Sequence, residues 1–257
     1  MPPPKPFDLD KLARSANAAP NRFVGVRLDR NRVFLPEAGN TVVRHVVPGS
    51  ETEAALIELR KRLRDLPWGH RFAFTDVESL HMTVFNGVIE TCREPGFWPQ
   101  ELALDLPIEA VTDYLAARLD GFSGPGPFDM RIAEVTPYGL TLTGATEADE
   151  KTARAWRDAL TGPFTYRAPK HDAYTFHVTL AYLIDWLPDD MVDCYRQALA
   201  ELTGEFRQRI PVVELGPPAF CTFEDMNGFP PVMTLEGTGL EPVLRTADQR
   251  LEADQPA

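Results

Sequence analysis

The sequence predicts an α+β fold in which two pseudo-symmetric lobes of antiparallel sheet, with helices outside, surround a central cleft. Three observations predict this class. Both halves of the chain show the same order of expected elements: strand, strand, helix, strand, helix. The third strand of each half carries the same short motif. The composition, with 44% hydrophobic and 25% charged residues among 257, is typical of a soluble globular protein that buries its own core.

Runs of β-branched and aromatic residues, bounded by proline, glycine and asparagine, mark the expected strands. These strands cover 22–28, 41–47, 79–88, 128–135, 139–143 and 174–184, with short ones near 211–215, 219–224 and 231–236. Apolar residues three and four positions apart mark the expected helices. The helices cover 51–65, 107–120, 147–160 and 189–203. Ser50 and Glu53 form a capping-box pattern at the start of the first helix.

The expected domain organisation is a single bilobal domain over residues 21–240 between two tails. Residues 1–20 are rich in proline and predict a flexible N-terminal tail, and residues 241–257 predict a C-terminal tail. Met1–Asp10 lacks the apolar stretch of a signal peptide, and no apolar run is long enough to span a membrane. The three cysteines are scattered, which favours reduced thiols. We therefore expect a cytoplasmic protein that does not contact a membrane.

The charge of the chain bears on its partners. Its formal net charge is −12, and such a surface repels the backbone of a long nucleic acid. A small nucleotide, or an RNA end held in a local pocket, remains compatible with it. A monomer is the default expectation.

Two segments of the chain carry the same pattern, apolar-His-apolar-Thr-apolar. The first contains His81 and Thr83, and the second contains His177 and Thr179. Side chains two apart on a strand share a face, so each strand offers an imidazole and a hydroxyl to one side. For a chain with five histidines, chance would produce such a pair about two times in a thousand. The duplicated pattern therefore predicts a functional pair.

These residue types suit the opening of a cyclic phosphodiester. One group must deprotonate water while another protonates the leaving oxygen, and histidine, with an ordinary pKa of about 6.5, can do either. Threonine hydroxyls can hydrogen-bond the non-bridging phosphate oxygens. Neither a metal nor another cofactor is required by this chemistry.

The paired motifs resemble those of the 2H phosphoesterase superfamily, which includes bacterial RNA 2′,3′-cyclic phosphodiesterases, plant cyclic phosphodiesterases and a vertebrate 2′,3′-cyclic-nucleotide phosphodiesterase. The resemblance covers roughly residues 22–225. It implies the duplicated fold with a central cleft, catalysis by His81 and His177, and phosphate binding by Thr83 and Thr179. Three stretches look like a branch classified only as a domain of unknown function. These stretches are 36–42, 81–88 and 171–179.

Other residues are weaker candidates for substrate contact. Phe85 shares the strand parity of His81 and could stack a base, although a core position is equally compatible. His171 and Lys170 precede the second motif in a loop-like stretch and could bind substrate, although solvent-facing positions are also compatible. Tyr174, Phe176 and Tyr182 have the opposite parity to His177, which predicts that they pack under helices. His45 and His70 lack a threonine partner and are interpreted as structural, and the tryptophans as packing residues.

The predicted function is the hydrolysis of a nucleoside or RNA-terminal 2′,3′-cyclic phosphate. Three alternatives stay open: another phosphodiester, such as an ADP-ribose cyclic phosphate or a 2′–5′ linkage; a nucleotide-binding module that does not turn over its ligand; and, more weakly, a structural protein with no ligand. The sequence does not assign acid and base between His81 and His177.

Overall fold

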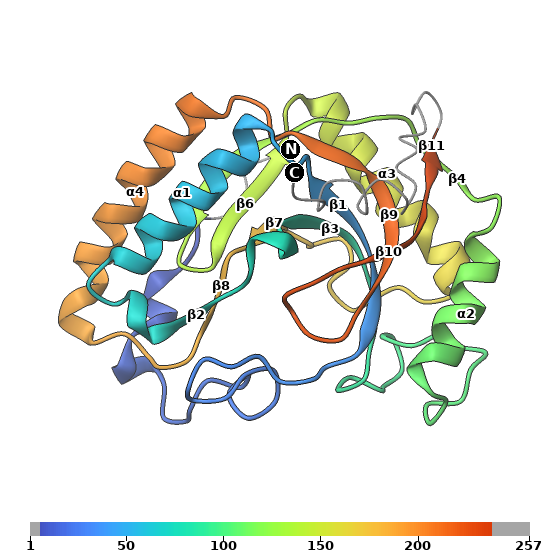
Figure 1. Ribbon diagram of the computed structural model, residues 1–257, viewed down its shortest axis with the longest axis horizontal. Coiled ribbons are helices and arrows are strands. Elements are labelled where there is room, and N and C mark those ends of the chain that lie inside the picture. The colour runs from blue at the N-terminus through green and yellow to red at the C-terminus, as the bar shows by residue number, and fades with distance from the viewer. Residues whose placement is uncertain (1–5, 238–257) are drawn as a thin grey trace, which may run out of the picture.

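A seven-stranded sheet forms the centre of the molecule in the computed structural model, which describes residues 6–237 (Figure 1). Every strand in it is antiparallel to its neighbours. From edge to edge the strands are β10 (Pro231–Thr234), β9 (Leu215–Phe223), β1 (Gly39–Val46), β3 (His81–Ile89), β7 (Phe176–Thr179), β6 (Gly139–Gly144) and β5 (Met130–Thr136). Two short pairs lie outside it: β2 (Phe72–Phe74) with β8 (Ala181–Leu183), and β4 (Ser123–Gly124) with β11 (Glu236–Gly237).

Four α-helices accompany the sheet in the described part of the chain. They are α1 (Glu51–Asp65), α2 (Ile108–Leu119), α3 (Glu147–Phe164) and α4 (Val192–Arg209). Figure 1 shows α1 beside α4 on one side of the molecule and α2 beside α3 on the other. The Ser50 hydroxyl accepts the Glu53 amide at the start of α1, as the sequence predicted, but the Glu53 carboxylate accepts the amide of Gly49 and not that of Ser50. None of the helices within residues 6–237 is long and apolar enough to cross a membrane.

Short 3₁₀ helices complete the elements. They are η1 (Leu9–Leu12), η2 (Arg14–Ala16), η3 (Gly69–Arg71), η4 (Val77–Ser79) and η5 (Asp189–Met191). The first two lie in the region expected to be a flexible tail. Leu9 and Leu12 are buried in the main core, because residues three apart share one face of this 3₁₀ helix, which packs against α4. Residues 9–16 therefore differ from the expected tail, and 241–257 lie outside the described residues.

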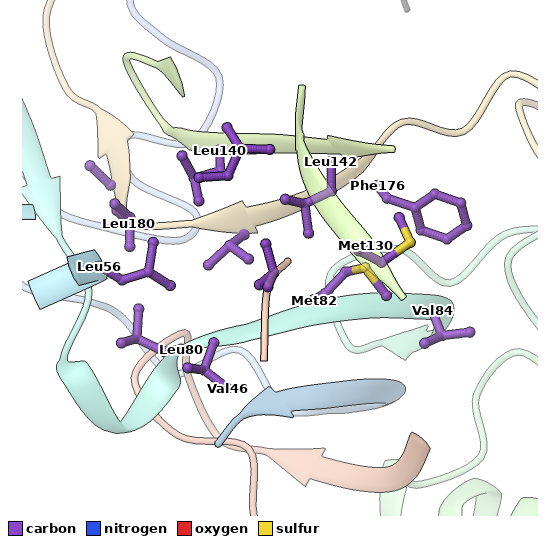
Figure 2. Packing of buried hydrophobic residues seen from close by; sticks show 14 of the residues in the cluster. Val46, Leu56, Leu80, Met82, Val84, Met130, Leu140, Leu142, Phe176 and Leu180 are labelled. Carbon is purple, nitrogen blue, oxygen red and sulfur yellow. The ribbon is translucent and has the colours of Figure 1, made fainter. Parts of the chain in front are cut away.

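The two faces of the sheet have different roles. Met82, Val84 and Val178 point into the main hydrophobic core with residues of the helices, and Figure 2 shows Met82 and Val84 among Met130, Leu142 and other core side chains. Each large apolar side chain buried there contributes about 1.5–3 kcal/mol. The motif residues alternate with these core positions and are only partly buried, so they lie on the opposite face. Packing of one face thus positions the polar residues of the other.

The expected α+β class is confirmed, but the arrangement of strands differs from two separate lobe sheets. Strands β3 and β7 pair with each other and join the strands of both halves into one sheet. The C-terminal strands β9 and β10 then extend this sheet beyond β1, so the last part of the chain completes the side formed by the first. The strands of the two halves therefore form one continuous sheet.

The strand expected at 22–28 is absent from the described structure, and a series of turns stands in its place. The Phe23 carbonyl accepts the amides of Val26, Arg27 and Leu28, which closes tight turns in this segment. Gly25 has a φ of +85° within them, a conformation that favours glycine. Leu28 is completely buried, so the segment packs against the protein without extending the sheet.

Candidate active site

The two motifs meet at the centre of the sheet. Met82 of β3 pairs with Val178 of β7 in an antiparallel register. One step along the ladder in each direction places His81 opposite Thr179, and Thr83 opposite His177. A local two-fold axis through the Met82–Val178 pair therefore relates the motifs, and each imidazole lies across from the hydroxyl of the other strand.

Both imidazoles are held by their own strands in the same way. The Nδ1 atom of His81 lies 2.6 Å from the carbonyl oxygen of Ser79, and Nδ1 of His177 lies 2.9 Å from that of Thr175. A carbonyl oxygen only accepts, so each Nδ1 carries a proton and donates it. In the neutral ring, Nε2 then keeps a lone pair that can receive or return a proton. The backbone thus selects the same tautomer at both positions.

Burial favours the neutral form of both rings. It lowers the pKa of His81 to about 3, although the Ser79 carbonyl opposes this change. Burial also lowers the pKa of His177, and the positive charge of Arg157 adds to the effect. Both motif histidines are therefore uncharged at neutral pH in the empty site.

A cavity of about 160 Å³ contains both motifs. Its lining includes His81, Thr83, His177 and Thr179, so the four motif side chains predicted from the sequence share one site. The remaining lining residues come from β1, β3, β8, β9, η4 and the neighbouring loops. They are Arg27, Asn40, Thr41, Thr75, Ser79, Asn86, Gly87, Ile89, Tyr182, Phe223, Met226 and Phe229.

The surroundings of His81 are closed and mostly apolar. The Phe229 ring lies 4.1 Å from the His81 ring between centroids. His45 is the cross-strand neighbour of His81, and its Nε2 atom is 2.9 Å from the Phe229 carbonyl oxygen. Phe229 belongs to a second hydrophobic cluster on this face of the sheet, with Val43, Ala219, Cys221, Phe223 and Met226. This cluster restricts the access of water to His81.

The surroundings of His177 are open and more polar. Its cross-strand neighbour on β6 is Thr141. His177 and Thr179 also line a groove of about 1240 Å³, and Glu134, Tyr138 and residues of the N-terminal segment form other parts of the wall. A groove of this volume is large enough for a ligand of nucleotide size.

Near each motif, a tyrosine contacts an arginine. Burial raises the pKa of Tyr174 to about 12, while Arg157 and Thr83 oppose the rise. The Arg157 guanidinium carbon is 3.7 Å from the Tyr174 ring centroid. At the second motif, burial raises the pKa of Tyr182, while Arg27 and Thr179 oppose it. Two Tyr–Arg groups therefore lie near the motifs, and of these only Tyr182 and Arg27 line the cavity.

The two arginines of these groups differ in their charge balance. Arg27 donates from Nε to a carboxylate oxygen of Glu37 at 2.6 Å, so its charge is paired. Arg157 is 2% exposed, donates to the Val84 carbonyl at 2.5 Å and forms no salt bridge with a described residue. Burial lowers the pKa of Arg157 to about 10, which leaves it charged at neutral pH. Arg157 therefore brings positive charge to the back of the site.

Phe85 lies outside the site, contrary to the parity expected for a regular strand. Val42 and Val43 are consecutive on β1, yet they pair with Phe85 and Thr83, so β3 carries an extra residue at this point. Such a bulge reverses the alternation of faces beyond it. Phe85 is 1% exposed and packs against Phe164 at 4.7 Å between ring centroids. It is a core residue.

His171 and Lys170 also lie away from the cavity. His171 is 4% exposed, so it is neither solvent-facing nor part of the site. Its Nε2 atom is 3.0 Å from the Asp158 carboxylate, and its ring lies beside Phe85. Lys170 is exposed in the adjoining turn. The stretch before β7 therefore supports the core behind the site.

Sequence reasoning missed the contribution of Tyr182. The strand expected over 174–184 is interrupted at Leu180, whose amide donates to the Tyr138 carbonyl at 2.7 Å. Strand β8 then leaves the main sheet and pairs with β2. This interruption turns Tyr182 into the cavity, whereas Phe176 stays buried as expected. The sequence pattern predicts a strand over 22–28 and gives no sign that Arg27 lines the cavity.

Among residues 6–237, no group of three or more histidine, cysteine, aspartate or glutamate side chains is placed to hold a metal ion. The three cysteines are all free thiols.

Comparison with known proteins places this geometry in a family. A solved structure from Agrobacterium tumefaciens str. C58, described as a conserved protein of unknown function, matches with a TM-score of 0.87 and 43% identity, covering 90% of this chain and 99% of that chain. No curated protein matches the chain significantly. A family model, 2H-phosphodiest, described as a domain of unknown function (DUF1868), matches residues 27–141, which include the first motif. The chain belongs to this branch of the 2H phosphoesterase family.

Proposed function

We propose that the protein hydrolyses a cyclic phosphodiester, of the nucleoside or RNA-terminal 2′,3′-cyclic phosphate class, by acid–base catalysis at His81 and His177 without a metal ion. One observation carries the proposal. The two imidazoles are related by a local two-fold axis, and each is held through Nδ1 so that Nε2 is free for proton transfer. Two such groups on opposite sides of one phosphorus atom suit an in-line displacement.

The reaction needs one neutral and one protonated histidine. The neutral imidazole takes a proton from water as the water oxygen bonds to phosphorus. The bond from phosphorus to one ribose oxygen breaks, and the imidazolium gives that oxygen a proton. The product is a phosphomonoester, and proton exchange with solvent restores the starting state. The local symmetry is compatible with either assignment of the two roles.

Binding of the anionic substrate favours uptake of the missing proton from solvent. Burial keeps both histidines neutral in the empty site, and Arg157 disfavours a positive charge on His177. A phosphate anion favours a neighbouring imidazolium, so its arrival raises the histidine pKa values. In this proposal the hydroxyls of Thr83 and Thr179 donate hydrogen bonds to the non-bridging oxygens, where negative charge is held in the transition state.

The test is turnover of the four nucleoside 2′,3′-cyclic phosphates and of a short RNA with a cyclic-phosphate end, in EDTA. We expect turnover by the wild type, and a loss on the order of 10²–10⁴ in kcat for His81→Ala and for His177→Ala. Lys170→Ala, a change at an exposed site away from the cavity, serves as the control and should keep full activity.

Two results would contradict the proposal. One is the absence of turnover with every substrate, and the other is turnover that survives both histidine substitutions. Saturable nucleotide binding without turnover would instead support a binding module of the same fold.

A further inference from the structure

A second cavity of about 800 Å³ lies next to the groove at His177. Asn17, Ala18, Ala19, Pro20 and Trp186 line both hollows, so the N-terminal segment and Trp186 form a wall that they share. The Trp186 indole donates to the Ala19 carbonyl at 2.6 Å, which fixes this wall. A ligand seated at His177 therefore has a neighbouring hollow into which it can extend.

Positive charge is concentrated in this second cavity. Among the described residues, its lining contains four arginines and one carboxylate, Asp185. Asp185 pairs with Arg14 at 3.1 Å and with Arg71 at 2.6 Å. Arg30 and Arg32 are exposed and form no salt bridge to a residue within 6–237. The chain as a whole carries a net charge of −12, so the positive lining of this cavity has the opposite sign to the net charge of the chain.

A tight turn presents the two unpaired arginines. The Asp29 carboxylate accepts the Asn31 amide at 2.8 Å and the Val33 amide at 2.9 Å. Arg32 has a φ of +70° in this turn, a left-handed conformation that is unusual for a residue with a side chain. The turn is therefore ordered by its own hydrogen bonds while both guanidinium groups remain available.

We propose that this cavity, defined by Arg14, Arg30, Arg32 and Arg71, is a second phosphate-binding subsite for a nucleotide whose cyclic phosphate lies at His81 and His177. The inference rests on the proposed function and names its substrate class: a nucleotide that carries a second phosphate away from the cyclic one. Guanidinium groups bind phosphate oxygens through paired, charge-assisted hydrogen bonds. The groove between the two sites would hold the nucleoside.

Two sources can supply this second phosphate. One is the 5′-phosphate of a mononucleotide, and the other is the internucleotide phosphodiester next to the cyclic end of an RNA strand. Both present phosphate oxygens to the same guanidinium groups, and a substrate panel separates them.

The test measures binding as well as turnover. Calorimetry would compare adenosine 2′-monophosphate with adenosine 2′,5′-bisphosphate on the wild type and on Arg30→Gln/Arg32→Gln. Turnover assays would compare adenosine 2′,3′-cyclic phosphate, its 5′-phosphorylated form and a 5′-hydroxyl dinucleotide with a cyclic end. The control is Arg64→Gln/Lys151→Gln, which removes the same charge at exposed positions on α1 and α3.

We expect the second phosphate to improve affinity and KM about tenfold in the wild type and the control, and the arginine variant to lose that gain. The gain should also fall as salt is raised, because exposed charges are screened. A gain with the 5′-phosphate alone, or with the dinucleotide alone, identifies the source.

Equal binding of the two adenosine nucleotides, with no gain from the dinucleotide, would overturn the subsite alone. A gain that persists in Arg30→Gln/Arg32→Gln would do the same. If no cyclic nucleotide is turned over and neither adenosine nucleotide binds, both the subsite and the proposed function fail.

Discussion

The two halves of the candidate active site share one chemistry but have different surroundings. His81 and His177 have the same tautomer, the same hydrogen bond to the carbonyl two residues earlier, and a threonine opposite. His81 nevertheless lies against Phe229 in an apolar cluster, whereas His177 opens into the groove of about 1240 Å³. The backbone of two central strands fixes the shared features, and loops outside those strands produce the differences.

This comparison separates catalysis from recognition. The Met82–Val178 register alone brings the four motif side chains together, so phosphate chemistry depends on a small and regular part of the fold. Many of the residues that line the hollows for a substrate come instead from 6–32 and 223–229, which follow no repeat. Changes in the loops should alter substrate choice and the acidity of each histidine, whereas changes in the motifs should remove activity.

Among the tests of this comparison, we expect the largest change in kcat when the two motif threonines are substituted. Thr83→Val and Thr179→Val each keep the shape of the side chain and remove the hydroxyl. If both hydroxyls stabilise the phosphoryl oxygens, each variant should lose on the order of 10²–10³ in kcat. Steady-state kinetics with a 2′,3′-cyclic nucleotide measures the loss. Thr152→Val on the exposed side of α3 is the control. A loss of kcat for only one of the two motif variants would show that the symmetry of the strands does not extend to their function.

The sequence predicted the motif geometry because that geometry is local. Alternation along a strand placed His81 and Thr83 on one face, with Met82 on the other, and the same rule held for His177 and Thr179. The rule failed for Phe85, because the bulge that displaces it depends on pairing with β1. It failed for Tyr182 because the Tyr138 carbonyl, from the turn before β6, interrupts the strand.

Contacts between residues that are distant in the chain explain the remaining differences between the predicted and the observed structure. The union of both halves into one sheet depends on the β3–β7 pair, whose strands are distant in the chain. The proline-rich start of the chain predicted a tail, but Leu9 and Leu12 find an apolar surface on the folded protein. Arg30 and Arg32 gave no signal in the sequence, because an arginine in a turn is ordinarily a solvated surface residue.

A smaller effect is expected from Phe229→Leu, which tests whether the apolar cluster causes the low pKa of His81. The smaller side chain should admit water and raise the pKa of His81 from about 3 toward its ordinary value, while the pKa of His177 stays unchanged. We expect a loss of roughly 1 kcal/mol in the free energy of unfolding. NMR titration of the imidazole protons measures both pKa values, and Val232→Ala on the exposed side of β10 is the control. Equal shifts at both histidines would show that their surroundings are coupled.

The smallest effect concerns the position of the pH optimum. In the free enzyme burial holds the pKa of His81 at about 3 and that of His177 below its ordinary value of 6.5. The active form has one neutral and one protonated histidine, so kcat/KM should peak at a pH below 6.5, the ordinary pKa of histidine, and fall as the pH rises further. Bound phosphate favours imidazolium and raises both pKa values, so the optimum of kcat should lie at higher pH. Rate profiles from pH 4 to 8 measure both quantities.

An optimum of kcat/KM above pH 7 would contradict the idea that burial keeps the empty site neutral. The protonated histidine would then have to titrate above its ordinary pKa before any substrate is bound.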